Sequence, residues 1–179
     1  MLMCSVCGQD FMDSGSDKCS ERCEQGSIAA AELTESLIKQ PRSNDDRVFF
    51  YDMGFGDLCD RYTILVLRRL HQRSLQEQIE TDFHIGRVRL SISTKINRLA
   101  CGSNVREQIG KLIQKLYCVN AKMWRLRSRA MSTSLPNEHC DAAATAFFGF
   151  TPDRDAVRQE LDLVVDGRAR NPRVYTVKA

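Results

Sequence analysis

Four of the eight cysteines lie in the first 23 residues, with spacings that suit one metal ion. Two residues separate Cys4 from Cys7, and three separate Cys19 from Cys23. Four thiolates form a closed tetrahedral set for a structural Zn²⁺ ion. A segment this short and polar cannot bury enough apolar surface to fold unaided, so a bound metal would supply the missing folding free energy. We therefore predict a Zn²⁺ site at these four cysteines; the alternative is a disulfide pair or free thiols.

The residues around each cysteine pair favour different local structures. Gly8 directly follows Cys7 and allows positive φ, so backbone amides there can point at the sulfurs. Cys19 and Cys23 are four residues apart and would share one face of a helical turn. Asp17, just before them, is a good N-cap type. The sequence thus predicts a turn at the first pair and the start of a helix at the second.

This arrangement resembles the small treble-clef zinc fingers of bacteria and phages, whose pattern is C-x2-C-G-x2-F, a polar loop, then C-S-x2-C. The residues that carry the resemblance are Cys4, Cys7, Gly8, Phe11, Cys19, Ser20 and Cys23. The resemblance covers only this short segment. Fingers of this type hold nucleic acid, hold protein or only stabilise the attached domain, so the resemblance does not fix the function.

A second polar group lies at the start of a predicted helix further along the chain. Asp57 and Asp60 are three residues apart and share a helix face, with Arg61 beside them. Asn120 lies beside the apolar stripe of another predicted helix. One hypothesis is that these four residues form a candidate pocket for a metal or substrate. The favoured one is structural: the carboxylates complement the helix dipole, and a buried Asn120 pairs with the Asp60 region and fixes helix register.

An enzymatic alternative rests on Glu77-x2-Glu80, which invites comparison with the all-α nucleotide pyrophosphohydrolases. Those helical bundles hold Mg²⁺ on paired carboxylates, together with substrate phosphates. The periodicity predicts that Asp57, Asp60 and Glu77 lie on one helix, which would separate Asp57 from Glu77 by about 30 Å. Solvated surface charge is therefore the preferred interpretation of Glu77 and Glu80. A metal-dependent enzyme acting on a nucleotide or small phosphorylated substrate stays an alternative.

Basic residues are concentrated on one predicted helix. Between Val105 and Met131 the sequence has seven basic residues and one acidic residue. At helical spacing, five of them share one broad face: Lys111, Lys115, Lys122, Arg125 and Arg129. Such a face can neutralise phosphates without reading bases, so we predict nucleic-acid binding there. The alternative is a solvated face paired with acidic partners. The single Trp argues against a base-stacking platform.

The composition is that of an ordinary globular protein. The 179 residues suffice for one medium domain and an appendage, and the net charge of +3 is mild. The other cysteines have no CxxC spacing and suit buried positions in a reducing compartment. The N-terminus has no signal-peptide pattern, and no stretch reaches the ~18 apolar residues of a membrane span. We expect a soluble cytoplasmic protein without a membrane partner, in the host cytoplasm if phage-encoded.

The apolar periodicity predicts a mainly α fold, with a small N-terminal zinc finger and an antiparallel helical bundle. The finger and its following helix would occupy residues 1–40, and the bundle domain residues 47–179. The predicted bundle helices cover 57–81, 85–99, 105–131, 138–148 and 152–165. Short apolar runs at 48–51 and 174–177 suit a two-stranded ribbon.

The helical part resembles an uncharacterised helical family of bacteria and phages. Residues 56–65 match its G-[DE]-L-x-D-[KR]-x-[ST]-I-L opening, residues 119–124 its V-N-x2-L-W segment, and 174–176 its tail. The chain departs from the family at 127–128, where the family carries an acidic pair, and at 151–152, where it carries Asn-Asp. If those polar groups form a family active site, this chain has lost part of it. The resemblance implies no activity.

Together these features predict a non-enzymatic zinc-binding accessory protein of phage or bacterial type. It would contact nucleic acid, or a host or phage protein that handles nucleic acid. The alternatives are the metal-dependent enzyme and a structural or assembly protein that uses the bundle as a protein-binding surface.

Overall fold

The computed structural model describes residues 53–98 and 102–170, together with short N-terminal pieces. Leu2–Met3 (β1) and Asp10–Phe11 (β2) pair antiparallel, with Leu2 opposite Phe11. Residues 24–26, 28 and 31–32 are helical, as the predicted helix after the finger requires. The four predicted zinc ligands, the domain boundary between 40 and 47 and both strands of the predicted ribbon lie outside the described residues.

The described chain is mainly helical, which confirms the mainly α part of the predicted fold class. Over residues 53–98 and 102–170 the helices are α2 (Phe55–His71), α3 (Leu75–Arg98), α4 (Ser103–Ala130), α5 (Asn137–Gly149) and α6 (Thr151–Arg170). The predicted helices at 105–131 and 138–148 correspond closely to α4 and α5. None of the described helices is long and apolar enough to cross a membrane.

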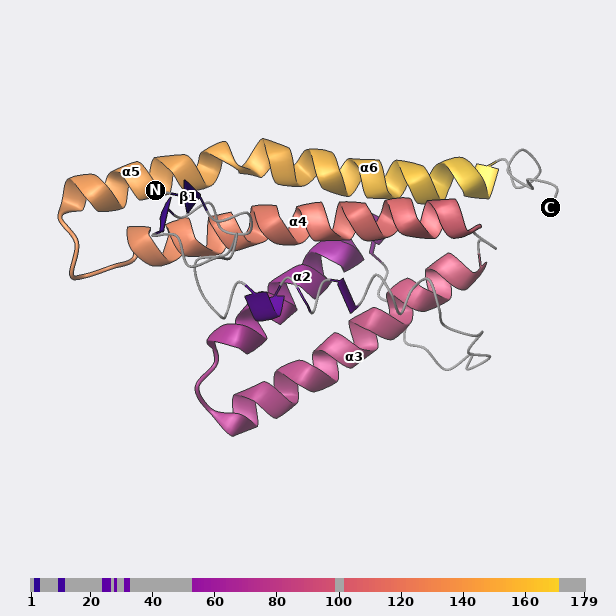
Figure 1. Cartoon of the computed structure of the whole chain (residues 1–179), viewed down its shortest axis with the longest axis horizontal. Helices are drawn as coiled ribbons and strands as arrows, with labels where there is room; N and C mark the ends of the chain where they lie inside the picture. Colours follow the sequence, from indigo (N-terminus) through magenta and orange to yellow (C-terminus); the bar gives the residue numbers. More distant parts are fainter. Residues whose placement is uncertain are drawn as a thin grey trace.

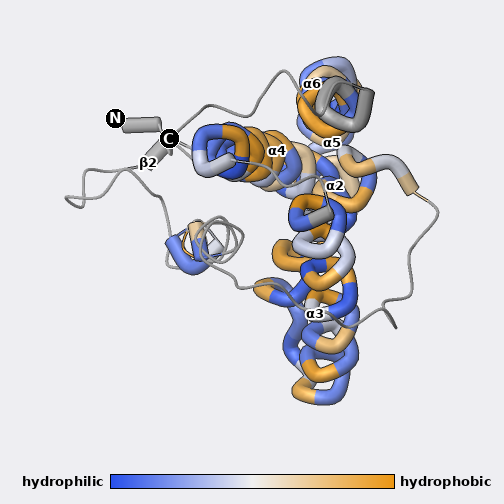
Figure 2. Tube along the Cα trace, turned by 90° about the vertical axis from the view of Figure 1, so that its right-hand side faces the viewer, coloured by the Kyte–Doolittle hydropathy of each residue, from blue (hydrophilic) through white to orange (hydrophobic). Residues whose placement is uncertain are grey.

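The helices pack around α2 and α4. Helix α4 runs opposite to α5 and α6, which follow one another along its length (Figure 1). Helix α2 contacts α3, α4 and α6, and lies between α3 and the α4–α6 pair (Figure 2). Among the described helices, α3 therefore packs mainly against α2.

The core forms where the apolar stripes of these helices meet. Its largest fully buried side chains include Leu58, Ile92, Ile109, Ile113, Leu116 and Leu161, which come from α2, α3, α4 and α6. The predicted stripe of α4 is buried from Val105 through Leu116, because residues three and four apart share one helix face. Burial of this stripe holds α4 at the centre of the bundle.

The predicted helix 57–81 is wrong, because the chain breaks at residues 72–74. Gln72 is extended, with ψ 138°, and its amide closes α2 by donating to the carbonyl of Arg68 at 3.1 Å. The amide of Gln78 donates to the carbonyl of Ser74, which places Ser74 at the start of α3. Ser74 and Glu77 have the S-x-x-E spacing of a capping box, a helix-start signal that the apolar periodicity concealed.

This break changes which residues face the core. Leu75 and Ile79, which fall within the predicted helix 57–81, lie exposed on α3. Glu77 and Glu80 are also exposed on α3 and do not share a helix with Asp57, so the single-helix separation argument does not apply. The predicted start of the second helix at residue 85 is likewise ten residues too late.

The last helix is longer than predicted. Helix α6 continues past Val165, through Gly167, to Arg170. A glycine inside a helix costs only about 1 kcal/mol relative to alanine, so it does not by itself end a helix.

Candidate functional site

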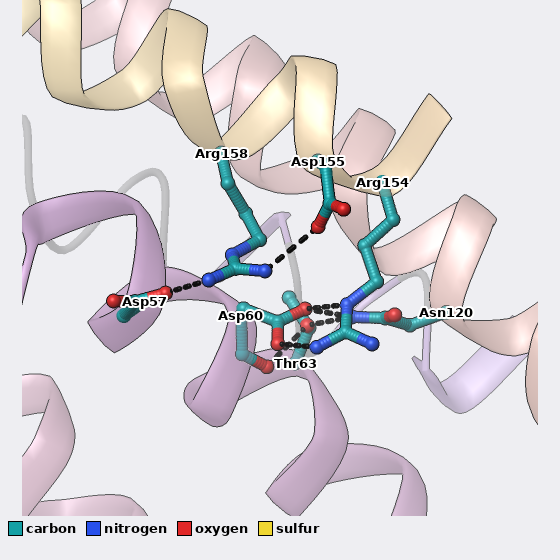
Figure 3. Close-up of polar contacts among 7 residues, drawn as sticks. All are labelled: Asp57, Asp60, Thr63, Asn120, Arg154, Asp155 and Arg158. Atoms are coloured by element: carbon teal, nitrogen blue, oxygen red, sulfur yellow. Dashed lines mark hydrogen bonds and ion pairs between the residues drawn. The ribbon is translucent and has the colours of Figure 1, made fainter. Parts of the chain in front are cut away.

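Asp60 of α2 is the centre of a polar cluster between three helices. Asn120 of α4 donates from Nδ2 to Asp60 Oδ1 at 2.8 Å. Arg154 of α6 donates from Nε to Oδ1 at 3.0 Å and from Nη2 to Oδ2 at 2.6 Å, a two-pronged ion pair (Figure 3). Both oxygens of this carboxylate are therefore occupied by donors from neighbouring helices.

Thr63, one turn after Asp60, completes this buried group. Its hydroxyl donates to the backbone carbonyl of Asp60 and accepts a hydrogen bond from Asn120 Nδ2, each at 2.8 Å. Asp60 is 6% exposed, Asn120 is 5% exposed and Thr63 is fully buried. Because a buried polar group is costly unless it is hydrogen-bonded, these contacts select one register between α2 and α4.

A second ion-pair group lies one turn away along the α2–α6 contact. Arg158 Nη2 donates to Asp57 Oδ1, and its Nη1 donates to Asp155 Oδ1 at 2.8 Å (Figure 3). Partial burial opposes the charge on Arg158, but the hydrogen bond to Asp57 and the charges of Asp57, Asp60 and Asp155 raise its pKa. These side chains are partly exposed, so they form the outer edge of the cluster.

The first turn of α2 receives its cap from α6. Gly54 at the N-cap offers no side chain, and the amide of Gly56 donates instead to Asp162 Oδ1 at 2.8 Å. The first amides of a helix have no intrahelical acceptor, and a carboxylate there also complements the helix dipole. Lys95 of α3 bonds the carbonyl of Met53 at 2.8 Å. Helices α6 and α3 thus both fix the start of α2.

The predicted pairing of Asn120 with Asp60 is confirmed. Asp57 lies in the adjoining group, whereas Arg61 is on the exposed side of α2. The guanidinium that pairs with Asp60 belongs to Arg154, 94 residues later. Sequence reasoning missed the following partners: Thr63, Arg154, Asp155, Arg158 and Asp162. The sequence did contain a signal for these ion pairs. The D-x2-D spacing of Asp57 and Asp60 on α2 matches the R-x3-R spacing of Arg154 and Arg158 on α6 when the two helices run antiparallel.

The chemistry of this cluster is that of a structural network. The carboxylate of Asp60 is buried and bonded on both oxygens. Burial, followed by the charges of Asp162 and Asp60, raises the pKa of the neighbouring Cys59 thiol, which therefore stays protonated. Burial also raises the pKa of Tyr62 to about 12. Among the described residues, no group of three or more His, Cys, Asp or Glu side chains is placed to hold a metal ion.

Neighbouring side chains already contact part of the predicted basic face of α4. Lys111 forms an i,i+4 ion pair with Glu107 at 2.7 Å, and the hydrogen bond between them lowers the pKa of Glu107. Lys122 is half-buried, with Nζ 5.8 Å from the centre of the Phe150 ring. Of the five predicted residues, Lys115, Arg125 and Arg129 have no ion pair with any described residue. Lys115 and Arg129 are exposed, and Arg125 is half-buried.

The end of α2 also carries basic residues and lies against α4. The His71 ring lies 5.3 Å from the Trp124 ring of α4, which brings the last turn of α2 against the C-terminal half of α4. The last turn of α2 carries Arg68 and Arg69, and the last turn of α4 carries Arg127 and Arg129. Arg69 is paired with Asp82 of α3, while Arg68, Arg127 and Arg129 are exposed.

The fold and the site define a mainly helical domain in which a buried polar network joins α2, α4 and α6. A scan against protein-family models, a search of curated proteins and a search of solved structures each found no match. The resemblances to treble-clef fingers and to the helical family therefore stay predictions.

Proposed function

We propose that this chain is a non-enzymatic, zinc-binding accessory protein that binds nucleic acid or a protein that handles nucleic acid. The observation that carries the proposal is the C-terminal half of α4. There Arg125, Arg127 and Arg129 have no acidic partner among the described residues, and the same holds for Lys115 near the middle of the helix. Cations left without carboxylate partners remain available to phosphates.

The second support is the basic end of α2. The contact between His71 and Trp124 places this turn, with the exposed Arg68, beside α4. Basic residues at a helix C-terminus also complement the helix dipole, and this applies to the last turns of both α2 and α4. Among the described residues, this region has few exposed aromatic rings. The proposed contact is therefore to the sugar-phosphate backbone of the nucleic acid and carries little sequence preference.

The enzymatic alternative finds less support. The carboxylate best placed for chemistry, Asp60, is buried and bonded to Asn120 and Arg154. A catalytic group must reach its substrate. Both oxygens of Asp60 already accept hydrogen bonds from neighbouring side chains, so the carboxylate is not available to a substrate. The function proposed here therefore rests on the surface of α4.

Lys115→Gln combined with Arg129→Gln is expected to weaken binding to a fluorescently labelled DNA duplex and RNA hairpin. Each lost phosphate contact should reduce the slope of log K against log salt by about 1. Fluorescence anisotropy between low and moderate salt measures both quantities. Lys111→Gln is the control: it removes one positive charge from the same helix, a charge already paired with Glu107.

The comparison with Lys111→Gln decides this proposal. Equal weakening in the single and the double variant, after allowing for the number of charges, would indicate non-specific attraction to net charge. Absent binding at low salt, or binding insensitive to salt, would contradict the proposed contact with nucleic acid.

The zinc part of the proposal is supported by the short hairpin at the N-terminus. Strand pairing places Met3 opposite Asp10, and the Cys4-x2-Cys7 pair lies in the six residues that connect the two strands in sequence. A cysteine pair between two short antiparallel strands is a common source of two zinc ligands. Cys19 and Cys23 would supply the other two.

Elemental analysis of the purified chain is expected to find about one zinc per chain. Cys4→Ser and Cys19→Ser should each lose the metal, because a structural site requires four ligands, and should make the N-terminal segment sensitive to protease. Cys140→Ser is the control, since its sulfur donates to the carbonyl of Ser132 at 3.4 Å in a different part of the chain. Zinc-free protein from cells grown with ample zinc would refute the site.

The assembly alternative has one specific observation in its favour. Helix α3 exposes several large apolar side chains on the face turned away from α2. This surface leads to a separate inference.

A further inference from the structure

We propose that the outer face of α3 is a self-association surface, on which a second copy of this chain packs its own α3 in antiparallel orientation. Four large apolar residues of this face are exposed: Leu75 at 71%, Ile79 at 55%, Phe83 at 64% and Leu90 at 36%. Their spacing places them along one side of the helix. The opposite side carries Val88, Ile92 and Ile96, which are buried. A surface helix normally has a single apolar face.

The exposed face of α3 has the residue spacing of a coiled-coil seam, with a gap at one position. Ile79, Phe83, Gly86 and Leu90 follow the 4-3-4 spacing of a coiled-coil seam. A Cβ added at Gly86 would meet nothing within 4 Å, so the seam has a gap there, one turn from the exposed Phe83 ring. In an antiparallel pair with two-fold symmetry, Phe83 can fill the gap at Gly86 of the second copy. The same register places Ile79 opposite Leu90 of the second copy.

The charges beside the seam fit this register. One flank carries Glu80 and Arg87, and the other carries Asp82 and Arg89. In antiparallel coiled coils each flank faces the same flank of its partner. Glu80 would therefore lie opposite Arg87 of the second copy, and Asp82 opposite Arg89. Two-fold symmetry repeats each attraction, so that every flanking charge of the seam meets its opposite.

The parallel arrangement fits less well. It would place Gly86 against Gly86 of the second copy and leave a void in the seam. It would also leave Glu80 opposite the apolar Leu75. Within one chain the guanidinium of Arg87 lies 5.7 Å from the centre of the Phe83 ring, so this charge is already beside the seam. Asp82 bonds Arg69 of its own chain, yet its side chain is still 53% exposed.

The size of the surface sets the expected strength. Helix α3 has 24 residues and is about 36 Å long. A single helix pair of this length buries an area at the low end of specific interfaces, below roughly 1,200 Å². We therefore expect a reversible dimer with a dissociation constant of micromolar order, present at high protein concentration and lost on dilution.

Sedimentation equilibrium in reducing buffer tests the proposal. The average mass should rise from 20.4 kDa toward twice that value as concentration increases. Phe83→Glu should keep the chain monomeric at every concentration. Phe148→Glu is the matched control, because Phe148 is 70% exposed on α5, away from the seam, and its substitution should leave the dimer intact. Circular dichroism verifies that each variant keeps its helical content.

Charge exchange tests the antiparallel register. Glu80→Arg and Arg87→Glu should each weaken self-association at least tenfold, because each places like charges opposite one another. The double variant should restore it, and an equimolar mixture of the two single variants should form a heterodimer. A chain that stays monomeric to about 100 μM overturns the proposal. Self-association that survives Phe83→Glu, or a charge mixture that does not associate, also overturns it. A monomer that Phe83→Glu destabilises would show that another part of the same chain covers this face.

Discussion

Replacing Asp60 by alanine is expected to lower the free energy of unfolding by about 3–5 kcal/mol, the usual cost of breaking a buried, hydrogen-bonded ion pair. The change removes the acceptor of both Arg154 and Asn120; among the described residues, the Asn120 side chain keeps Thr63 as an acceptor, whereas the Arg154 guanidinium keeps none. The guanidinium of Arg154 is partly exposed and would recover some hydration, so we expect the lower part of this range. Urea denaturation followed by circular dichroism measures the effect.

Asp57→Ala is the matched control for this prediction. It removes the same group three residues earlier on the same helix, but the Asp57 side chain is 37% exposed and its partner Arg158 keeps a second bond to Asp155. Exposed ion pairs contribute only about 0–1 kcal/mol. Equal losses in the two variants would contradict the central place given to Asp60.

The same measurement separates a structural network from a ligand site. Polar groups held ready for a ligand commonly lower stability, so their removal leaves stability unchanged or raises it. A structural carboxylate behaves in the opposite way. A more stable Asp60→Ala protein would therefore indicate that Asp60 binds a ligand, and would support the hypothesis that Asp60 and Asn120 belong to a ligand pocket.

The fold was predictable from sequence where one apolar stripe stayed regular. Helix α4 keeps its three-and-four spacing from Val105 to Leu116, and its bounds followed from it. The break between α2 and α3 was missed because apolar residues recur on both sides of it, up to Leu70 and again from Leu75. The capping-box spacing of Ser74 and Glu77 was the available local signal, and it carries less weight than a long stripe.

The candidate site was predictable only in part, for a related reason. A buried Asn needs a hydrogen-bond partner, so the pairing of Asn120 with Asp60 followed from residue type and position. Arg154 and Asp162 depend on knowing that α6 packs antiparallel to α2. No local pattern indicates which two helices pack together, so the matching spacings on α2 and α6 become informative only once that pairing is known. The i,i+4 pairing of Lys111 with Glu107, by contrast, could have been predicted from the sequence and was overlooked.

Replacing Gly56 by alanine is expected to destabilise the protein by about 2–3 kcal/mol, through a clash between the backbones of two helices. A Cβ at Gly56 would overlap the carbonyl oxygen of Arg158 and lie 2.8 Å from its carbonyl carbon and 2.9 Å from its Cα. Backbone cannot rotate away as a side chain can, so α2 or α6 would have to shift. That shift would also strain the bond from the Gly56 amide to Asp162 and the pair between Arg158 and Asp57.

Gly149→Ala makes this prediction decisive, because the two substitutions are chemically identical and differ only in their surroundings. Gly149 is the last residue of α5, and a Cβ there would meet nothing within 4 Å. Alanine should be neutral at this position or stabilise the helix by up to about 1 kcal/mol. A loss at Gly56 with none at Gly149, measured by urea denaturation, would place the cost in the contact with α6. Should Gly56→Ala be as well tolerated as Gly149→Ala, the close approach of α2 and α6 that brings Asp60 to Arg154 would be refuted.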